Sequence, residues 1–190
     1  MIWVLTGFMG CGKTSVGRLV ASLCSDGGFI DLDEQIESSE GRSIPEIFAT
    51  VGEAGFRAIE RDALAYLLQA DRSSSFGSSL LIGLGGGTLT NPECREMVKK
   101  HCRCIYLRGS VRTLAENLRG TGAEGRPMLA GVNPEAPADA PDSLESRIAS
   151  LMAGRGPIYE EAADVILDID GLSIEEIARR VSSLLTSSRS

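Results

Sequence analysis

The chain has 190 residues, of which 43% are hydrophobic and 24% are charged, and its formal net charge at pH 7 is −7. This length and composition fit one globular domain with a single core and exclude a disordered chain. The acidic balance argues against a general partner of nucleic acid or anionic membranes, because phosphate-rich surfaces repel a negatively charged protein.

Two further features bear on where the protein works. No apolar run approaches the roughly 18 residues that a membrane span needs, and the first residues lack the basic region and cleavage site of a secretory signal. The five cysteines are odd in number and lie mostly in apolar surroundings, which favours reduced thiols over a disulfide framework. We therefore expect a cytoplasmic protein.

Short apolar segments alternate with longer segments of helical periodicity along the chain. In chain order, the sequence predicts a strand at 2–6, a helix at 12–24, a strand at 28–32, a charged helix ending at 40, a helix at 52–70, a strand at 80–84, a helix at 91–101, a strand at 104–107, a helix at 110–119, a strand at 165–169 and a helix at 173–185. This alternation predicts an α/β fold with a parallel sheet covered on both faces and ligands beyond the carboxyl ends of its strands.

Two segments carry more specific expectations. The helix at 52–70 is predicted to bury an apolar face made by Phe56, Ile59, Ala63, Tyr66 and Leu67. The segment from Gly120 to Pro141 is rich in Gly, Ala and Pro and has no apolar period. It is interpreted as a mobile flap over a site, with a plain linker as the alternative.

A phosphate-binding motif follows the first predicted strand. Residues 7–14, Gly-Phe-Met-Gly-Cys-Gly-Lys-Thr, match G-x-x-x-x-G-K-[ST] between a strand and a helix. In such a loop the glycines let backbone N–H groups cradle phosphate oxygens, and the helix N-terminus adds positive potential. Lys13 would neutralise the terminal phosphates and the Thr14 hydroxyl would ligate Mg²⁺, which indicates a nucleoside triphosphate site in a phosphotransferase.

Two aspartates follow the second predicted strand. If the strand continues through Asp31, then Asp31 and Asp33 share one face and point into the cleft. Two such acids favour two roles, in which Asp31 supports the metal through water and Asp33 faces the acceptor hydroxyl. The alternative is that one of them caps the following helix.

Arg57 and Glu60 lie three residues apart and therefore on one helix face. They are either a surface ion pair of little consequence or a guanidinium held in place for a substrate carboxylate. Three glycines at 85–87 follow the third strand, where they let the backbone approach a ligand closely.

These motifs together resemble the shikimate kinase family of P-loop, nucleoside-monophosphate-kinase-like proteins. The matching elements occur in the family's order: the loop at 7–14, Asp-Leu-Asp at 31–33, Gly-Glu-Ala-Gly-Phe-Arg-Ala-Ile-Glu at 52–60, the triple glycine, Arg-Pro-Met-Leu at 126–129 and Arg-Gly-Pro-Ile-Tyr-Glu at 155–160. The resemblance implies a five-stranded parallel sheet ordered 2-3-1-4-5 and transfer of the γ-phosphate of ATP to the 3-hydroxyl of shikimate, a step in chorismate and aromatic amino-acid biosynthesis.

The resemblance also implies a role for each matching residue. On the ATP side these are Gly10, Cys11, Gly12, Lys13, Thr14 and Ser15, with Asp31 on Mg²⁺ through water, Arg126 closing over the phosphates and Arg119 stacking on adenine. On the acceptor side Asp33 would act as base, Arg57 and Arg155 would clamp the carboxylate, and the Gly86 backbone would contact a ring hydroxyl. For Arg126 and Arg155 the alternative is a solvated loop charge.

We expect a single monomeric domain over 1–190, with a core at 1–32, 78–110 and 160–190, a substrate-binding region at 33–62 and a lid at about 119–141. Two departures from the family stand out: Lys13-Thr14-Ser15 replaces the common Lys-Ser-Thr or Lys-Thr-Thr, and the segment 131–141 is longer. The competing hypotheses are a kinase for gluconate or a nucleoside monophosphate, and a non-catalytic nucleotide-binding regulator. The second is disfavoured because Lys13, Asp33 and Arg126 are all present.

Overall fold

Five parallel strands form one sheet in the order β2-β3-β1-β4-β5, as predicted. The structure is a computed structural model that describes residues 1–24, 27–69, 79–121, 127–129, 132 and 136–187. The strands are β1 (Ile2–Thr6), β2 (Gly27–Asp31), β3 (Ser79–Gly83), β4 (Arg103–Arg108) and β5 (Val165–Asp168). Each predicted strand is confirmed to within about a residue at its ends.

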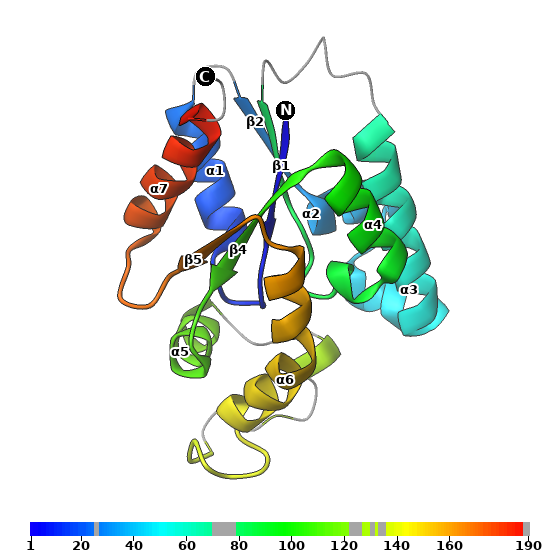
Figure 1. Ribbon diagram of the computed structural model, residues 1–190. Coiled ribbons are helices and arrows are strands. Elements are labelled where there is room, and N and C mark those ends of the chain that lie inside the picture. Colours follow the sequence, from blue (N-terminus) through cyan, green and yellow to red (C-terminus); the bar gives the residue numbers. More distant parts are fainter. Residues whose placement is uncertain (25–26, 70–78, 122–126, 130–131, 133–135, 188–190) are drawn as a thin grey trace.

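Helices cover both faces of this sheet (Figure 1). Their bounds are α1 (Lys13–Leu23), α2 (Leu32–Glu40), α3 (Ile44–Gln69), α4 (Pro92–His101), α5 (Val111–Thr121), α6 (Leu144–Ala162) and α7 (Ile174–Ser187), with 3₁₀ turns η1 (Thr88–Thr90) and η2 (Pro127–Leu129). Helices α1 and α7 pack together on one side, while α3 and α4 lie on the other. Within the described part of the chain, no helix has both the length and the apolarity that crossing a membrane requires.

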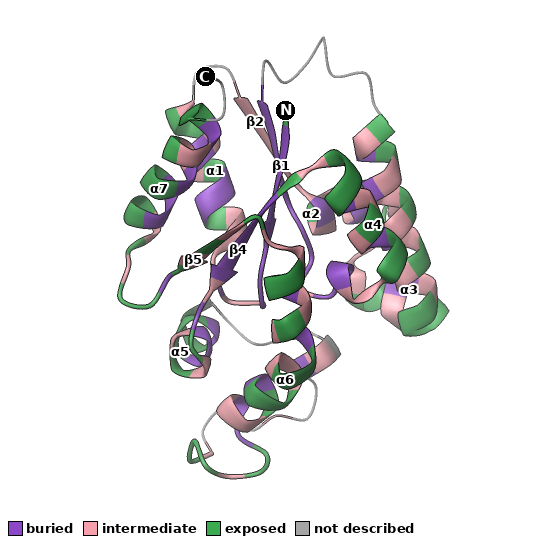
Figure 2. Cartoon of the chain, viewed as in Figure 1, coloured by how far each residue is buried: buried purple, intermediate pink, exposed green. Residues whose placement is uncertain are grey.

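The three central strands form the middle of the core. Strands β1 and β3 are buried throughout and β4 nearly so, whereas the edge strands β2 and β5 are more accessible (Figure 2). The register places Gly83 opposite both Leu5 and Asp31, so β1, β2 and β3 end at the same level. The loops that follow these strands therefore converge at one edge of the sheet.

Helix α3 differs from its prediction in two ways. It begins at Ile44 rather than near residue 52, and a kink at Gly52 (φ 71°, ψ −178°) separates its first two turns from the rest. The prediction that Tyr66 is part of the buried face is wrong, because its exposed fraction is 68%. The buried stripe instead includes Glu60, which is fully buried beside apolar neighbours.

Helix α6 is a long element that was not predicted from the sequence. Gly154, Gly156 and Pro157 lie inside it, and both glycine and proline disfavour helix. Packing overrides these preferences, because the helix buries apolar side chains along its length, including Leu144, Ile148 and Tyr159. Helix α6 is therefore stabilised mainly by tertiary contacts.

Candidate active site

The phosphate-binding loop takes the predicted form between β1 and α1. Gly12 is the N-cap of α1 with φ 86°, a left-handed conformation that a side chain would strain. The Lys13 ammonium donates to the backbone carbonyls of Gly7 (2.8 Å) and Phe8 (3.2 Å), so it lies over the loop. The first turn of α1 adds its free N–H groups to the same place.

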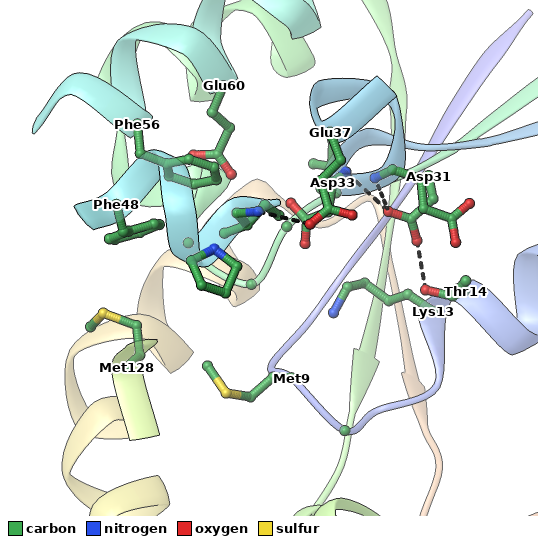
Figure 3. A pocket seen from close by; sticks show the side chains of 18 of the residues that line it. Met9, Lys13, Thr14, Asp31, Asp33, Glu37, Phe48, Phe56, Glu60 and Met128 are labelled. Carbon is green, nitrogen blue, oxygen red and sulfur yellow. Dashed lines mark hydrogen bonds between the residues drawn. The ribbon is translucent and has the colours of Figure 1, made fainter. Parts of the chain in front are cut away.

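A cavity of about 480 Å³ opens beside this loop. It brings together Lys13, Asp33, Arg57 and Arg155, which the sequence predicted on one crevice. The predicted residues Gly10, Gly12, Thr14, Ser15, Asp31 and Gly86 also line it. Cys11 is buried in the loop instead, with 1% of its surface exposed. Figure 3 shows the side chains of Lys13 and Asp33 pointing into the same space.

Asp31 and Thr14 form a direct contact between β2 and α1. The Thr14 hydroxyl donates to Asp31 Oδ2 at 2.6 Å (Figure 3). The other oxygen, Oδ1, accepts from the backbone N–H groups of Asp33 (3.0 Å) and Glu34 (3.4 Å). Asp31 is therefore the N-cap of α2, and the helix-capping alternative applies to this aspartate rather than to Asp33.

The prediction that Asp33 continues the strand is wrong, although the prediction that both aspartates face the cavity is confirmed. Strand β2 ends at Asp31 and α2 begins at Leu32, so Asp33 lies in the first helical turn and not on a strand. Both aspartates still line the cavity, because the chain turns into the helix at its edge. Asp33 reaches the cavity from the helix N-terminus.

Burial is the main cause that raises the pKa of Asp33 to about 6, with added repulsion from Asp31 and Glu60. The cations of Lys13 and Arg57 oppose this rise but do not cancel it. A carboxylate with such a pKa is ionised at pH 7 yet accepts a proton more readily than an ordinary aspartate. These are the properties of a general base.

Arg57 is held by a buried acid. Its Nη1 donates to Glu60 Oε2 at 2.6 Å, and the Glu60 side chain is 1% exposed. Thr88 donates to the other Glu60 oxygen at 2.6 Å. The surface-pair alternative for Arg57 and Glu60 is therefore wrong. Breaking such a buried pair leaves an uncompensated charge, which costs far more than losing an exposed one.

One donor of Arg57 has no partner among the described residues. Its Nε–H is buried and forms no hydrogen bond with any residue that the structure describes. A buried donor left unpaired costs about 1–3 kcal/mol, so its presence calls for a reason. Since Arg57 lines the cavity, the unpaired Nε–H is suited to an anionic ligand there.

The triple glycine packs against these same side chains. A Cβ atom at Gly87 would lie 2.3 Å from Nη2 of Arg57, and one at Gly85 would lie 2.7 Å from Oε1 of Glu60. Any side chain at Gly87 would therefore displace the guanidinium. The sequence predicted close approach of this backbone to a ligand, and the structure adds close approach to the side chains of the site.

Arg155 reaches the cavity from α6. Its residue surface is 7% exposed, its Nη1 donates to the Gly86 carbonyl at 3.3 Å, and its guanidinium lies 5.9 Å from the centre of the Phe8 ring. The solvated-loop alternative is wrong for this residue, because it is buried on a helix. The cavity thus contains two held guanidinium groups.

The two remaining predicted arginines stand apart from these. Arg119 forms an ion pair with Glu145 at 2.8 Å, which links α5 to α6, and it does not appear among the cavity-lining residues that the structure describes. Its role at adenine stays a prediction. Arg126 lies outside the described residues, as does much of the predicted lid.

One wall of the cavity is apolar and was not predicted from the sequence. Met9, Phe48 and Met128 line one side of it (Figure 3), and the Phe48 ring lies 4.6 Å from that of Phe56. Asn117, also missed, donates to the Gly10 carbonyl at 2.9 Å. The helical spacing of Ile44, Ile47 and Phe48 was the signal that could have revealed the first turns of α3 and this wall.

The cavity combines a phosphate-binding loop with the Thr14–Asp31 pair, and it also contains Asp33 and the guanidinium groups of Arg57 and Arg155. This combination is that of a P-loop kinase that phosphorylates a small acceptor. Comparison with known proteins identifies its family. The profile described as shikimate kinase matches residues 9–186. The chain belongs to the shikimate kinase family.

Individual relatives agree with this assignment. The chain is 38% identical to a shikimate kinase of Chlorobaculum tepidum over 93% of this chain and 88% of the relative. It is 35% identical to one of Symbiobacterium thermophilum, covering 96% and 94%. Among solved structures, an Acinetobacter baumannii shikimate kinase in complex with shikimate has a TM-score of 0.79 at 29% identity, covering 98% and 93% of the two chains. One from Bacteroides thetaiotaomicron has a TM-score of 0.80 at 29% identity, covering 98% of each.

Proposed function

We propose that this protein transfers the γ-phosphate of ATP to the 3-hydroxyl of shikimate, giving shikimate 3-phosphate and ADP. The observation that carries the proposal is the buried Nε–H of Arg57, which no described residue accepts and which lies in the same cavity as Lys13 and Asp33. Shikimate is a small ring with one carboxylate and several hydroxyls. A planar guanidinium binds such a carboxylate through two parallel hydrogen bonds.

On the ATP side, the backbone of residues 10–15 and the Lys13 ammonium hold the phosphates. Thr14 and Asp31 provide hard oxygen atoms next to each other, which fits Mg²⁺. No cluster of three or more His, Cys, Asp or Glu ligands occurs among the residues described, so phosphate and water oxygens would complete the coordination. Bound Mg²⁺ would neutralise charge on the phosphates.

On the acceptor side, Arg57 and Arg155 hold the carboxylate and the Gly86 region contacts a ring hydroxyl. Asp33 then accepts the proton of the 3-hydroxyl while the hydroxyl oxygen attacks the γ-phosphorus. The bond between the γ-phosphorus and the bridging oxygen breaks, and ADP leaves with its electrons. Phosphoryl transfer depends chiefly on such positioning and charge neutralisation. We assign Arg126 and the lid at about 119–141 to closing the site against water, and Arg119 to adenine.

We further propose that the enzyme works as a monomer in the cytoplasm, without nucleic-acid or membrane partners. All five cysteines are free thiols, which supports a reducing compartment.

Arg57→Ala is expected to raise the KM for shikimate by about 10²-fold, because it removes a charged bidentate partner and leaves the buried Glu60 carboxylate without its cation. The KM for ATP should change far less, since Arg57 lies on the acceptor side of the cavity. Steady-state kinetics with each substrate varied in turn provide the measurement. Arg61→Ala, one turn along on the half-exposed side of α3, serves as the matched control. An unchanged KM for shikimate would remove Arg57 from the acceptor site.

The pKa of Asp33 predicts the acid limb of the pH profile. Only the ionised carboxylate accepts a proton, so kcat/KM for shikimate should fall as pH drops through about 6, tenfold for each further pH unit. Between pH 7 and 8 the same group should leave the rate nearly constant. The profile is measured at saturating ATP, with enzyme stability checked at each pH. A limb centred near the ordinary aspartate pKa would contradict the raised value.

A further inference from the structure

We infer that Tyr159 is a positioning residue for the acceptor: its hydroxyl, together with Arg155, fixes the Gly86–Gly87 peptide and so orients the Gly87 N–H offered to the substrate. This inference rests on the proposed function, because it concerns the acceptor half of the same cavity. Tyr159 does not itself line the cavity and acts through the glycine loop.

Two donors on α6 meet at one acceptor. The Tyr159 hydroxyl donates to the Gly86 carbonyl oxygen, and Arg155 Nη1 donates to the same oxygen at 3.3 Å. The two side chains are four residues apart and thus share a face of the helix. Tyr159 is fully buried, and its ring packs against Tyr106 of β4 with ring centres 5.2 Å apart. The hydroxyl is therefore held rigidly in place.

The hydroxyl remains a donor throughout the neutral pH range. Burial raises the pKa of Tyr159 above its usual value, with only partial relief from the nearby Arg155. The contact with Gly86 is therefore a tyrosine O–H donating to a carbonyl, with no change of charge that could weaken it.

A planar peptide carries this anchoring to the cavity. In a trans peptide the C=O of Gly86 and the N–H of Gly87 point in opposite directions, so holding the oxygen aims the N–H. Neither Gly86 nor Gly87 donates its N–H to another group in the described part of the chain, which leaves both available to a ligand. Both residues line the cavity.

The loop needs such an anchor because of its composition. Three consecutive glycines have no side chains to restrict their dihedral angles, and an unanchored loop would lose much conformational entropy on binding. Gly87 also packs against the guanidinium of Arg57, so movement of this peptide would disturb the carboxylate clamp. By fixing the peptide in advance, Tyr159 would lower the cost of binding the acceptor.

Tyr159→Phe tests this role, because phenylalanine keeps the packed ring and removes only the hydroxyl. Tyr106→Phe is the matched control: it is the same change in the neighbouring ring, which forms no hydrogen bond to the glycine loop in the described part of the chain. Calorimetric titration gives the Kd of each variant for shikimate and for ADP. We expect Tyr159→Phe to weaken shikimate binding three- to ten-fold and to leave ADP binding within two-fold. Tyr106→Phe should change neither.

A purely structural role for Tyr159 predicts a different result. Partial unfolding would lower the number of active sites and the apparent kcat, while the Kd and KM for shikimate would stay unchanged. Unchanged shikimate affinity in Tyr159→Phe, or equal losses for shikimate and ADP, would overturn the inference. Failure of the unaltered enzyme to phosphorylate shikimate would instead overturn the proposed function, so the two failures are distinguishable.

Discussion

Lys13→Ala is expected to lower kcat for phosphate transfer to shikimate by about 10³-fold or more. Removing one preorganised donor to developing charge typically costs 10²–10³-fold, and Lys13 carries a full positive charge. Its ammonium already lies over the loop, 2.8 Å from the Gly7 carbonyl, so little rearrangement separates it from the phosphates. The measurement is kcat at saturating ATP and shikimate.

Lys100→Ala provides the control, because Lys100 is an exposed residue on α4 away from the cavity. Its rate should match that of the unaltered enzyme. A Lys13→Ala variant that retains more than a tenth of the normal kcat would remove Lys13 from the phosphate site. A circular dichroism spectrum of each variant establishes that the fold is intact.

Asp33→Asn is expected to lower kcat by about 10²–10⁴-fold and to leave the KM for ATP nearly unchanged, because asparagine cannot accept the proton of the 3-hydroxyl.

The same substitution should stabilise the fold at pH 7. Burial raises the pKa of Asp33 from 3.8 to about 6, so its ionised form is less favourable in the folded than in the unfolded chain. Removing the charge relieves a cost on the order of 3 kcal/mol, since the shift of about two pKa units is worth about 1.4 kcal/mol per unit.

The stability gained by Asp33→Asn should depend on pH in a defined direction. Because the folded pKa is above the unfolded one, the unaltered protein is penalised fully above pH 6 and not at all well below pH 3.8. The stability advantage of Asp33→Asn should therefore fall as pH is lowered from 6 to 4. Urea unfolding across this range measures it, with exposed Asp142→Asn as control. If Asp33→Asn lowered both the activity and the free energy of unfolding at pH 7, the proposal that ionised Asp33 destabilises the fold would be contradicted.

Local patterns explain how much of this structure was predictable. The alternation of apolar and helical segments indicated the α/β class, and the loop at 7–14 located the phosphate site without any other information. Both signals are short-range, because they depend on periodicity and on residue types at fixed spacing. The strand order and the pairing of Arg57 with Arg155 came from the family resemblance, since neither follows from local spacing.

Other features depend on contacts between distant segments. Helix α6 contains Gly154, Gly156 and Pro157, and forms because packing outweighs these preferences. Glu60 lies on the buried face of α3, between Phe56 and Leu64, because Arg57 and Thr88 satisfy its carboxylate there. The contact of Tyr159 with Gly86 joins residues 73 positions apart, which no local rule anticipates.

Specificity for shikimate follows from the two guanidinium groups and Asp33, and it is measured with a panel of acceptors. ADP release is followed in a coupled assay with ATP and Mg²⁺, using shikimate, gluconate, nucleoside monophosphates or no acceptor. Among these acceptors, we expect only shikimate to give rapid ADP release, matched mole for mole by shikimate 3-phosphate. Arg57, Arg155 and Asp33 select a ring that bears both a carboxylate and a hydroxyl. Equal or faster release with gluconate or a nucleoside monophosphate, or release that does not depend on an acceptor, would contradict it.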